Sequence, residues 1–438
     1  MTDSPNSPTG SVRRHGRNIS TPLMRRSTKG PLDAVDEYLC QAQNALSPLG
    51  EPASKSPVDP ESASASARTP SGKGPVSPPP AGLPHRLKTG IDLRFLQDPN
   101  LYHPLPTSDV ATAFWDSTQQ PPPGTALAGL LKGGHFRRAA DGAVNELRRC
   151  SSDDTTQILK LLYTRFACLV LVSRPDIAAQ EALPLLDFLA RNAGGANDVT
   201  TVVPWELRLL LVRLQSVGAQ DGGRRGIMGL YTLAAEARVH AKESDQDENL
   251  LQLWRQRLDD LGLRVADALV EMGELETANR HLDTLSPPHM VDDITYRKAL
   301  LKARVGDVDG AQACVNNLSD TRQQNKLHAL LKMADGEVTQ AAGSWQSQHK
   351  SDASALDANN CAVSMLYTGR ITTAYEVFEK LANDHSGFPA LLFNLGTVYE
   401  LCTERAVERK SALAQSMAAK PPSPDCGGWE KATFDFKL

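Results

Sequence analysis

The strongest constraint on the fold of this chain is a glycine followed five residues later by an alanine, a pattern that recurs in four segments of its second half. The segments read MGELETANRHL, VGDVDGAQACV, DGEVTQAAGSW and TGRITTAYEVF. Their glycines are Gly273, Gly306, Gly336 and Gly369, and their alanines are Ala278, Ala311, Ala341 and Ala374. The glycines are 33, 30 and 33 residues apart, which is typical of a helix pair that stacks on copies of itself.

Each position of this repeat has a physical reason. The glycine ends the first helix of a pair, where the backbone needs a left-handed residue. The alanine allows the second helix to approach the first closely. A large apolar residue follows four positions later on the same helix face and fills the space between the helices. These apolar residues are Leu282, Val315, Trp345 and Phe378.

A second small residue lies seven positions before each glycine, at Ala266, Ala299, Ala329 and Ala362. Adding 34 to the last of these gives Gly396, in the stretch FNLGTVYELC. A glycine inside a helix is unfavourable by about 0.5–1 kcal/mol relative to alanine, so it needs a packing reason. We expect Gly396, between Leu395 and Tyr399, to be the small contact position in the first helix of a further repeat.

The Leu-Gly-x-x-Tyr fragment and the spacing are typical of tetratricopeptide repeats. We therefore predict an all-α fold, with a tetratricopeptide-repeat-like α-solenoid over 125–420. A weaker relative of the pattern, LKGGHFRRAADGAV, lies near its start. Between 150 and 255 the sequence predicts helices, but it does not assign them to a repeat register. The last segment, 421–438, is expected to be a tail.

Residues 1–90 are rich in Ser, Pro, Gly, Thr and Ala, and we predict that they are disordered because they bury too little apolar surface to offset the entropy of ordering. Within them, Leu32, Val35, Leu39 and Leu46 follow a helical period. A short helix over 31–46 would dock on the body of the protein, bind a partner, or form transiently without a role. Residues 91–124 combine large apolar groups with prolines, which predicts an extended arm packing on the solenoid.

Nothing in the sequence predicts catalysis or a cofactor. A phosphate-binding loop, a nucleophile elbow and an HExxH motif are absent from the sequence, and its seven cysteines form no CxxC pair. The net charge of −4 argues against nucleic-acid binding, and the sequence contains neither a secretory signal nor an apolar run long enough to span a membrane. We expect a cytoplasmic binding protein that is not an enzyme.

Stacked helix pairs present a concave surface formed by their first helices. In the register above, Asn359, Asn360 and Asn394 are predicted to point toward it, where amides could bind the backbone of a partner. Hydrogen bonding within the solenoid is the alternative role for these residues. A peptide-binding co-chaperone adaptor would instead need basic residues there, for which Lys298, Lys302 and Lys332 are the scattered candidates.

The C-terminal part resembles the subunit twelve family of the trafficking protein particle complex, known as TRAPP. The resemblance is carried by NNCAVSMLYTGR, by LFNLGTVYEL and by the basic helix that follows, and YHPLPTSDVATAFWDSTQQPPPG resembles the segment before that family's repeats. It covers about 90 to 420. It implies a non-catalytic scaffold that contacts other TRAPP subunits, acts indirectly on a Rab-family GTPase in early secretory traffic and autophagy, and associates peripherally with Golgi or vesicle membranes.

Overall fold

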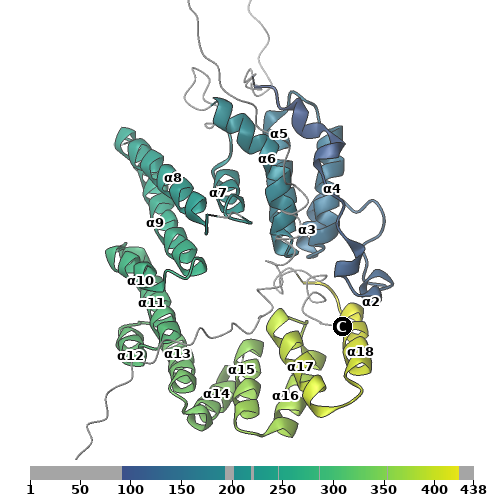
Figure 1. The fold of residues 1–438 in the computed structure, drawn as a ribbon, viewed down its shortest axis with the longest axis vertical. Coiled ribbons are helices and arrows are strands. Elements are labelled where there is room, and N and C mark those ends of the chain that lie inside the picture. Colours follow the sequence, from purple (N-terminus) through teal and green to yellow (C-terminus); the bar gives the residue numbers. More distant parts are fainter. Residues whose placement is uncertain are drawn as a thin grey trace, which may run out of the picture. The chain divides into compact units, whose positions relative to one another are not determined.

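The computed structural model describes residues 91–192, 202–218, 221–244, 246–285, 287–352 and 354–423. Within these ranges every regular element is helical, so the predicted all-helical fold class is confirmed (Figure 1). The predicted tail over 1–90, with its helix over 31–46, lies outside the described residues, as does nearly all of 421–438.

The N-terminal part of the helical body contains α3 Leu127–Lys132 and α4 Phe136–Arg149. The stretch that had no repeat register follows, with α5 Thr155–Leu171, α6 Pro175–Asn192, α7 Trp205–Leu214 and α8 Arg224–Glu243. Buried side chains of α5, α6 and α7 form one hydrophobic cluster, which includes Leu162, Phe166, Ala182 and Leu207. At the start of α5 the Asp154 carboxylate accepts the backbone N–H of Gln157 and so caps the helix.

The repeats form consecutive helix pairs, which are α9 Glu248–Glu271 with α10 Leu275–Thr284, α11 Val291–Val305 with α12 Val308–Asn316, α13 Thr321–Ala334 with α14 Val338–Asp352, α15 Ala355–Tyr367 with α16 Ile371–Asp384, and α17 Pro389–Cys402 with α18 Ala406–Ala419. The structure places Ala278, Ala311, Ala341 and Ala374 at equivalent points of the second helices, and each is 0% exposed.

The repeat glycines end the first helices with left-handed backbone. Gly273, Gly306, Gly336 and Gly369 have φ angles of 80°, 91°, 87° and 76°. The residue after each glycine donates its N–H to a carbonyl five residues earlier, as from Asp307 to Lys302 at 2.9 Å. This bond satisfies a helix-end carbonyl that would otherwise lack a partner. The turn therefore fixes where the second helix of each pair begins.

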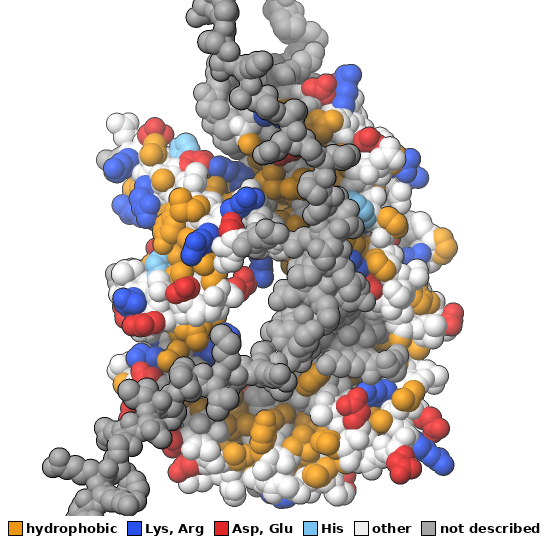
Figure 2. Space-filling view, in the orientation of Figure 1, with side chains coloured by type: hydrophobic (Ala, Val, Ile, Leu, Met, Phe, Trp, Pro, Cys, Tyr) orange, Lys and Arg blue, Asp and Glu red, His pale blue; other side chains and the backbone are white. Residues whose placement is uncertain are grey.

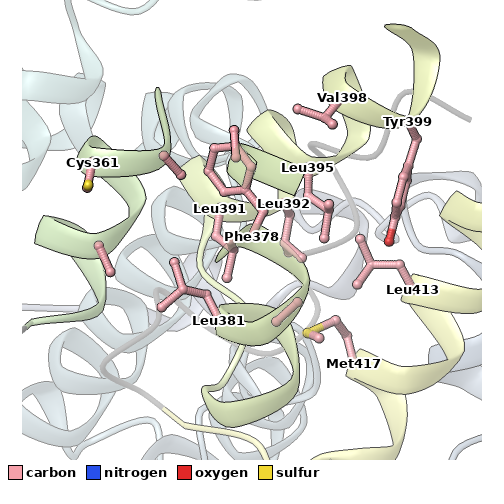
Figure 3. Close-up of a cluster of buried hydrophobic side chains, with 14 of the residues drawn as sticks. Cys361, Phe378, Leu381, Leu391, Leu392, Leu395, Val398, Tyr399, Leu413 and Met417 are labelled. Carbon is pink, nitrogen blue, oxygen red and sulfur yellow. The ribbon is translucent and has the colours of Figure 1, made fainter. Parts of the chain in front are cut away.

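Gly396 is buried in α17, directly after Leu395, which packs with Phe378 and Leu391 in the C-terminal cluster (Figure 3). A Cβ atom built on Gly396 would meet only the Cε of Lys410, at 3.7 Å, which is ordinary contact. Lys410 is 5% exposed, and its Nζ bonds the carboxylate of Glu400. The position therefore has to be small because the Lys410 stem crosses it, but it has room for a methyl group.

We expect Gly396→Ala to raise the free energy of unfolding by about 0.5–1 kcal/mol, because alanine fits and lowers the entropy of the unfolded chain. Gly229→Ala in α8 is the matched control. Its new Cβ would lie 2.8 Å from the Cγ1 of Val212, a β-branched side chain that cannot swing away, so we expect a loss of about 1–3 kcal/mol. Chemical denaturation of both variants measures the two free energies of unfolding. A lower free energy of unfolding for Gly396→Ala would contradict the prediction.

Residues 91–118 contain short helical turns, η1 Arg94–Gln97, η2 Pro99–Leu101, η3 Thr107–Asp109 and α2 Thr112–Trp115. Leu93 and Leu96 are buried in the cluster of α5, α6 and α7. Val110 and Phe114 are buried instead in the cluster of α15 to α18. The Ser117 hydroxyl donates to the Ala418 carbonyl at 2.5 Å, so α2 lies beside α18 (Figure 1). We refer to residues 91–118 as the arm.

A buried ion pair holds the middle of the arm. Arg165 of α5 and Glu181 of α6 have side chains that are 1% and 0% exposed, and the Arg165 Nε–Glu181 Oε2 and Nη2–Oε1 distances are 3.0 and 2.8 Å. Arg165 Nη2 also donates to the His103 carbonyl at 2.8 Å, and the His103 N–H donates to Glu181 Oε1 at 2.7 Å. Burial alone would lower the pKa of Arg165, but the Glu181 and Asp141 carboxylates raise it above its ordinary value.

Candidate partner-binding face

Several first helices of the repeats carry exposed apolar side chains, and on α15 and α17 one of them occupies the same repeat position. Five residues after the small contact positions Ala362 and Gly396 come Tyr367 and Leu401, which are 75% and 68% exposed. Leu300, Leu356 and Phe393 are also exposed on first helices. On α15 and α17 these residues recur with the helical period, so they lie on one side of each helix. We call Leu300, Leu356, Tyr367, Phe393 and Leu401 the first-helix face.

Large apolar side chains are costly to leave in water, and an exposed group of them is a common mark of an interaction surface. Figure 2 shows apolar side chains on the visible surface over the C-terminal helices α15 to α17. Aromatic residues such as Tyr367 and Phe393 contribute strongly where a partner covers them. The face therefore suits a partner that presents apolar side chains.

The structure brings the three predicted asparagines together between α15 and α17. The Asn394 Nδ2 donates to Asn359 Oδ1 at 3.1 Å, and the Asn359 Nδ2 donates to Asn360 Oδ1 at 3.4 Å. Asn359 is 2% exposed, whereas Asn360 and Asn394 are partly exposed. The amides thus link neighbouring repeats, and contact with a partner stays a prediction. The other predicted contacts, Leu32, Val35, Leu39 and Leu46, lie outside the described residues.

Sequence reasoning overlooked a buried acid beside this face. Asp357 of α15 is 3% exposed, and its Oδ1 lies 3.4 Å from the Nζ of Lys326 on α13. Asp357 occupies the first turn of α15, where an acid is favoured by the helix dipole, so its position in the helix was the available signal. The pair joins two first helices across successive repeats.

The three lysines considered for a basic clamp all contact polar groups of the solenoid. The Lys298 Nζ lies 2.9 Å from Asp283, the Lys302 Nζ lies 2.8 Å from Asp307, and the Lys332 Nζ donates to Ser344 at 3.1 Å. The hydrogen bond to Asp307 raises the pKa of Lys302. Their charges are directed to neighbouring acids or hydroxyls rather than gathered at one point where a ligand carboxylate could bind.

Tyr399 is fixed at the C-terminal end of the repeats. It is 3% exposed, and its hydroxyl donates to Glu379 Oε1 at 2.7 Å. Burial raises the pKa of the Tyr399 phenol, and the hydrogen bond to Glu379 raises it further. Leu395, one helical turn before it, is 0% exposed and packs in the same cluster (Figure 3). The Leu-Gly-x-x-Tyr fragment is thus a packing unit.

Titratable side chains in the described part of the chain do not converge on a metal site. No group of three or more His, Cys, Asp or Glu residues there is placed to hold an ion. His281 Nε2 lies 2.9 Å from the Gly262 carbonyl, and His289 lies 3.6 Å from Asp259. None of the helices in the described ranges has the length and apolar character needed to cross a bilayer.

Comparison with known proteins gives a distant relationship over about half of the chain. No family model matches the chain. It is 24% identical over 229 residues to trafficking protein particle complex subunit 12 of Mus musculus and 23% identical over 229 residues to that of Homo sapiens. Both matches cover 48% of this chain, but only 27% and 29% of the two relatives.

Among solved structures, the TPR domain of P58(IPK) is matched at 13% sequence identity, with 67% of this chain and 90% of that chain covered and a TM-score of 0.20. Because this TM-score is low, the fold assignment rests on the repeat positions and the helix pairs described above. The chain is therefore an all-helical protein of stacked helix pairs that, over about half of its length, is distantly similar to subunit 12 of the trafficking protein particle complex.

Proposed function

We propose that this chain is a non-catalytic scaffold subunit of a TRAPP-type assembly. The observation that carries the proposal is the distant similarity to subunit 12 across nearly half of the chain. In this role the chain binds other subunits and supports Rab GTPase nucleotide exchange and vesicle tethering, in traffic from the endoplasmic reticulum to the Golgi and in autophagy. It is cytoplasmic, and it associates with early secretory membranes through the assembly.

The first-helix face supports this role because it offers exposed apolar side chains on the first helices α11, α15 and α17. A subunit contact of ordinary size needs such a surface, with aromatic anchors near its centre. The second candidate function, a peptide-binding co-chaperone adaptor, has less support. Such an adaptor reads a terminal carboxylate with free cations, whereas Lys298, Lys302 and Lys332 contact Asp283, Asp307 and Ser344.

Affinity purification of the full chain, followed by mass spectrometry, tests the proposal. We expect other TRAPP subunits in stoichiometric yield. Recovery of chaperones in their place would favour the adaptor. Recovery of neither TRAPP subunits nor chaperones would overturn the scaffold role.

We expect the double substitution Tyr367→Ser with Leu401→Ser to weaken the affinity for the other subunits about thirty-fold, because two lost anchors of about 1 kcal/mol each sum to about 2 kcal/mol. The side chains are 75% and 68% exposed, so the free energy of unfolding should change little. Leu183→Ser is the matched control, since Leu183 of α6 is 56% exposed but lies outside the repeats. Equal losses in both variants would contradict a specific role for the first-helix face.

A further inference from the structure

A groove of about 870 Å³ separates the arm from α18. Its volume lies in the range of sites that hold a ligand or a peptide segment. One wall is formed by arm residues from Thr107 to Thr118, and the other by α18 residues from Ser411 to Ala419. The groove does not overlap the first-helix face.

The anchoring of the arm explains why the groove is open. Val110 and Phe114 turn inward and are buried with Leu413 and Met417 of α18. Ala111 and Trp115 then line the groove, and Trp115 remains 39% exposed. Apart from Gln415, the wall on α18 is made of the short side chains of Ser411, Ala414, Ala418 and Ala419, which leave space in the groove. A ligand has to supply the bulk.

The lining also defines the chemistry of the ligand. Hydroxyl groups of Thr107, Thr112, Ser117 and Ser411 border an otherwise apolar floor, and a hydroxyl can both donate and accept a hydrogen bond. Asp116 is the charged side chain of this lining. Such a site suits an extended polypeptide with large apolar side chains and little net charge. It does not suit an anion, because it offers no cation.

We propose that residues 429–438 of this same chain, WEKATFDFKL, dock in this groove. The described chain ends at Ser423, four residues beyond Ala419 of the groove wall. Gly427 and Gly428 follow, and paired glycines allow a chain to reverse direction. Six residues from Ser423 to Trp429 reach up to about 20 Å, whereas the α18 wall from Ser411 to Ala419 is about 12 Å long.

The segment has the matching side chains. Phe434, Phe436 and Leu438 alternate with other residues, so an extended backbone places them on one side. Trp429 adds a further large ring. The side-chain charges of Glu430, Lys431, Asp435 and Lys437 sum to zero, so the segment brings no net side-chain charge into a groove whose charged side chain is Asp116. Docking covers Trp115 and fastens the arm to α18.

Trypsin cleavage after Lys431 in the full chain tests the docking. The variant Gln415→Trp fills the groove from an exposed position of its α18 wall, and Ser416→Trp, exposed on the same helix outside the groove, is its control. We expect Gln415→Trp to accelerate cleavage about ten-fold, because proteolysis follows the population of the open form, while Ser416→Trp matches the unmodified protein. Phe434→Ser with Phe436→Ser should give the same acceleration.

Equal cleavage in all of these proteins would overturn the proposal. So would protection that grows with protein concentration, since the segment would then dock on a second copy. Hydrogen exchange of arm residues 112–118 provides an independent measurement, because loss of the docked segment should raise exchange there in both groove and segment variants. Unchanged exchange in the segment variant would likewise contradict docking.

Discussion

Glu181→Ala is expected to lower the free energy of unfolding by about 3–5 kcal/mol, because it leaves the buried guanidinium of Arg165 without its main partner. Both side chains are essentially inaccessible to water, and the Asp141 carboxylate that remains near Arg165 is 58% exposed. The backbone N–H of His103 also loses its acceptor, so the middle of the arm should loosen. Chemical denaturation, with hydrogen exchange at residues 100–106, measures both effects.

Two controls separate the buried charge from a general effect of losing an acid. Glu271→Ala removes the partner of Arg213, a pair whose side chains are 62% and 61% exposed, and it should change stability by less than about 1 kcal/mol. Arg165→Met with Glu181→Leu replaces both charges by apolar groups and should restore most of the loss. An equal loss for Glu181→Ala and the double variant would show that the ion pair is not the cause.

Phe378→Ala is expected to cost about 3–5 kcal/mol, through lost burial and the cavity left behind. Phe378 of α16 is 0% exposed and lies among Leu381, Leu391 and Leu395 in the C-terminal cluster (Figure 3). Because repeats are stabilised mainly by their neighbours, the loss should concentrate in α15 to α18. Hydrogen exchange of these helices, compared with that of α5, measures it.

Phe393→Ala is the matched control for this prediction. It is the same chemical change on the adjacent first helix, but Phe393 is 39% exposed on the first-helix face. We expect stability to change by about 1 kcal/mol or less and binding of other subunits to weaken. If Phe378→Ala and Phe393→Ala lowered the free energy of unfolding equally, burial of Phe378 at the repeat position would not explain its effect.

The repeat half of the fold could be predicted from sequence because its constraints are local. A left-handed turn requires glycine at Gly273 and Gly306, and close helix contact requires alanine at Ala278 and Ala311, each within one helix pair. The same logic identified Gly396 as a contact position. It did not reveal that the Lys410 stem of the next helix sets the size limit, because a lysine stem that covers a glycine leaves no mark on the sequence pattern.

No repeat register could be assigned to the N-terminal half because its helix lengths do not match the repeat unit. Helices α5 and α6 are 17 and 18 residues long, so this pair alone already exceeds a unit of 34 residues. Arg165 and Glu181 lie within apolar stretches that predict buried helix faces, and nothing local indicates that two charged residues on neighbouring helices will meet. Likewise, the sequence allowed hydrogen bonding within the solenoid as one role for Asn359 and Asn394, but it did not single out the bond between their amides across repeats.

The contact between Ser117 and Ala418 joins residues 301 positions apart, and this has a consequence for biosynthesis. A ribosome adds about 5–20 residues per second, so on the order of 15 to 60 s pass between the emergence of α2 and that of its docking helix. During that interval Val110 and Phe114 have no burial site. Nascent chains stalled before residue 406 should therefore recruit holding chaperones through this segment, and release them once α18 has left the exit tunnel.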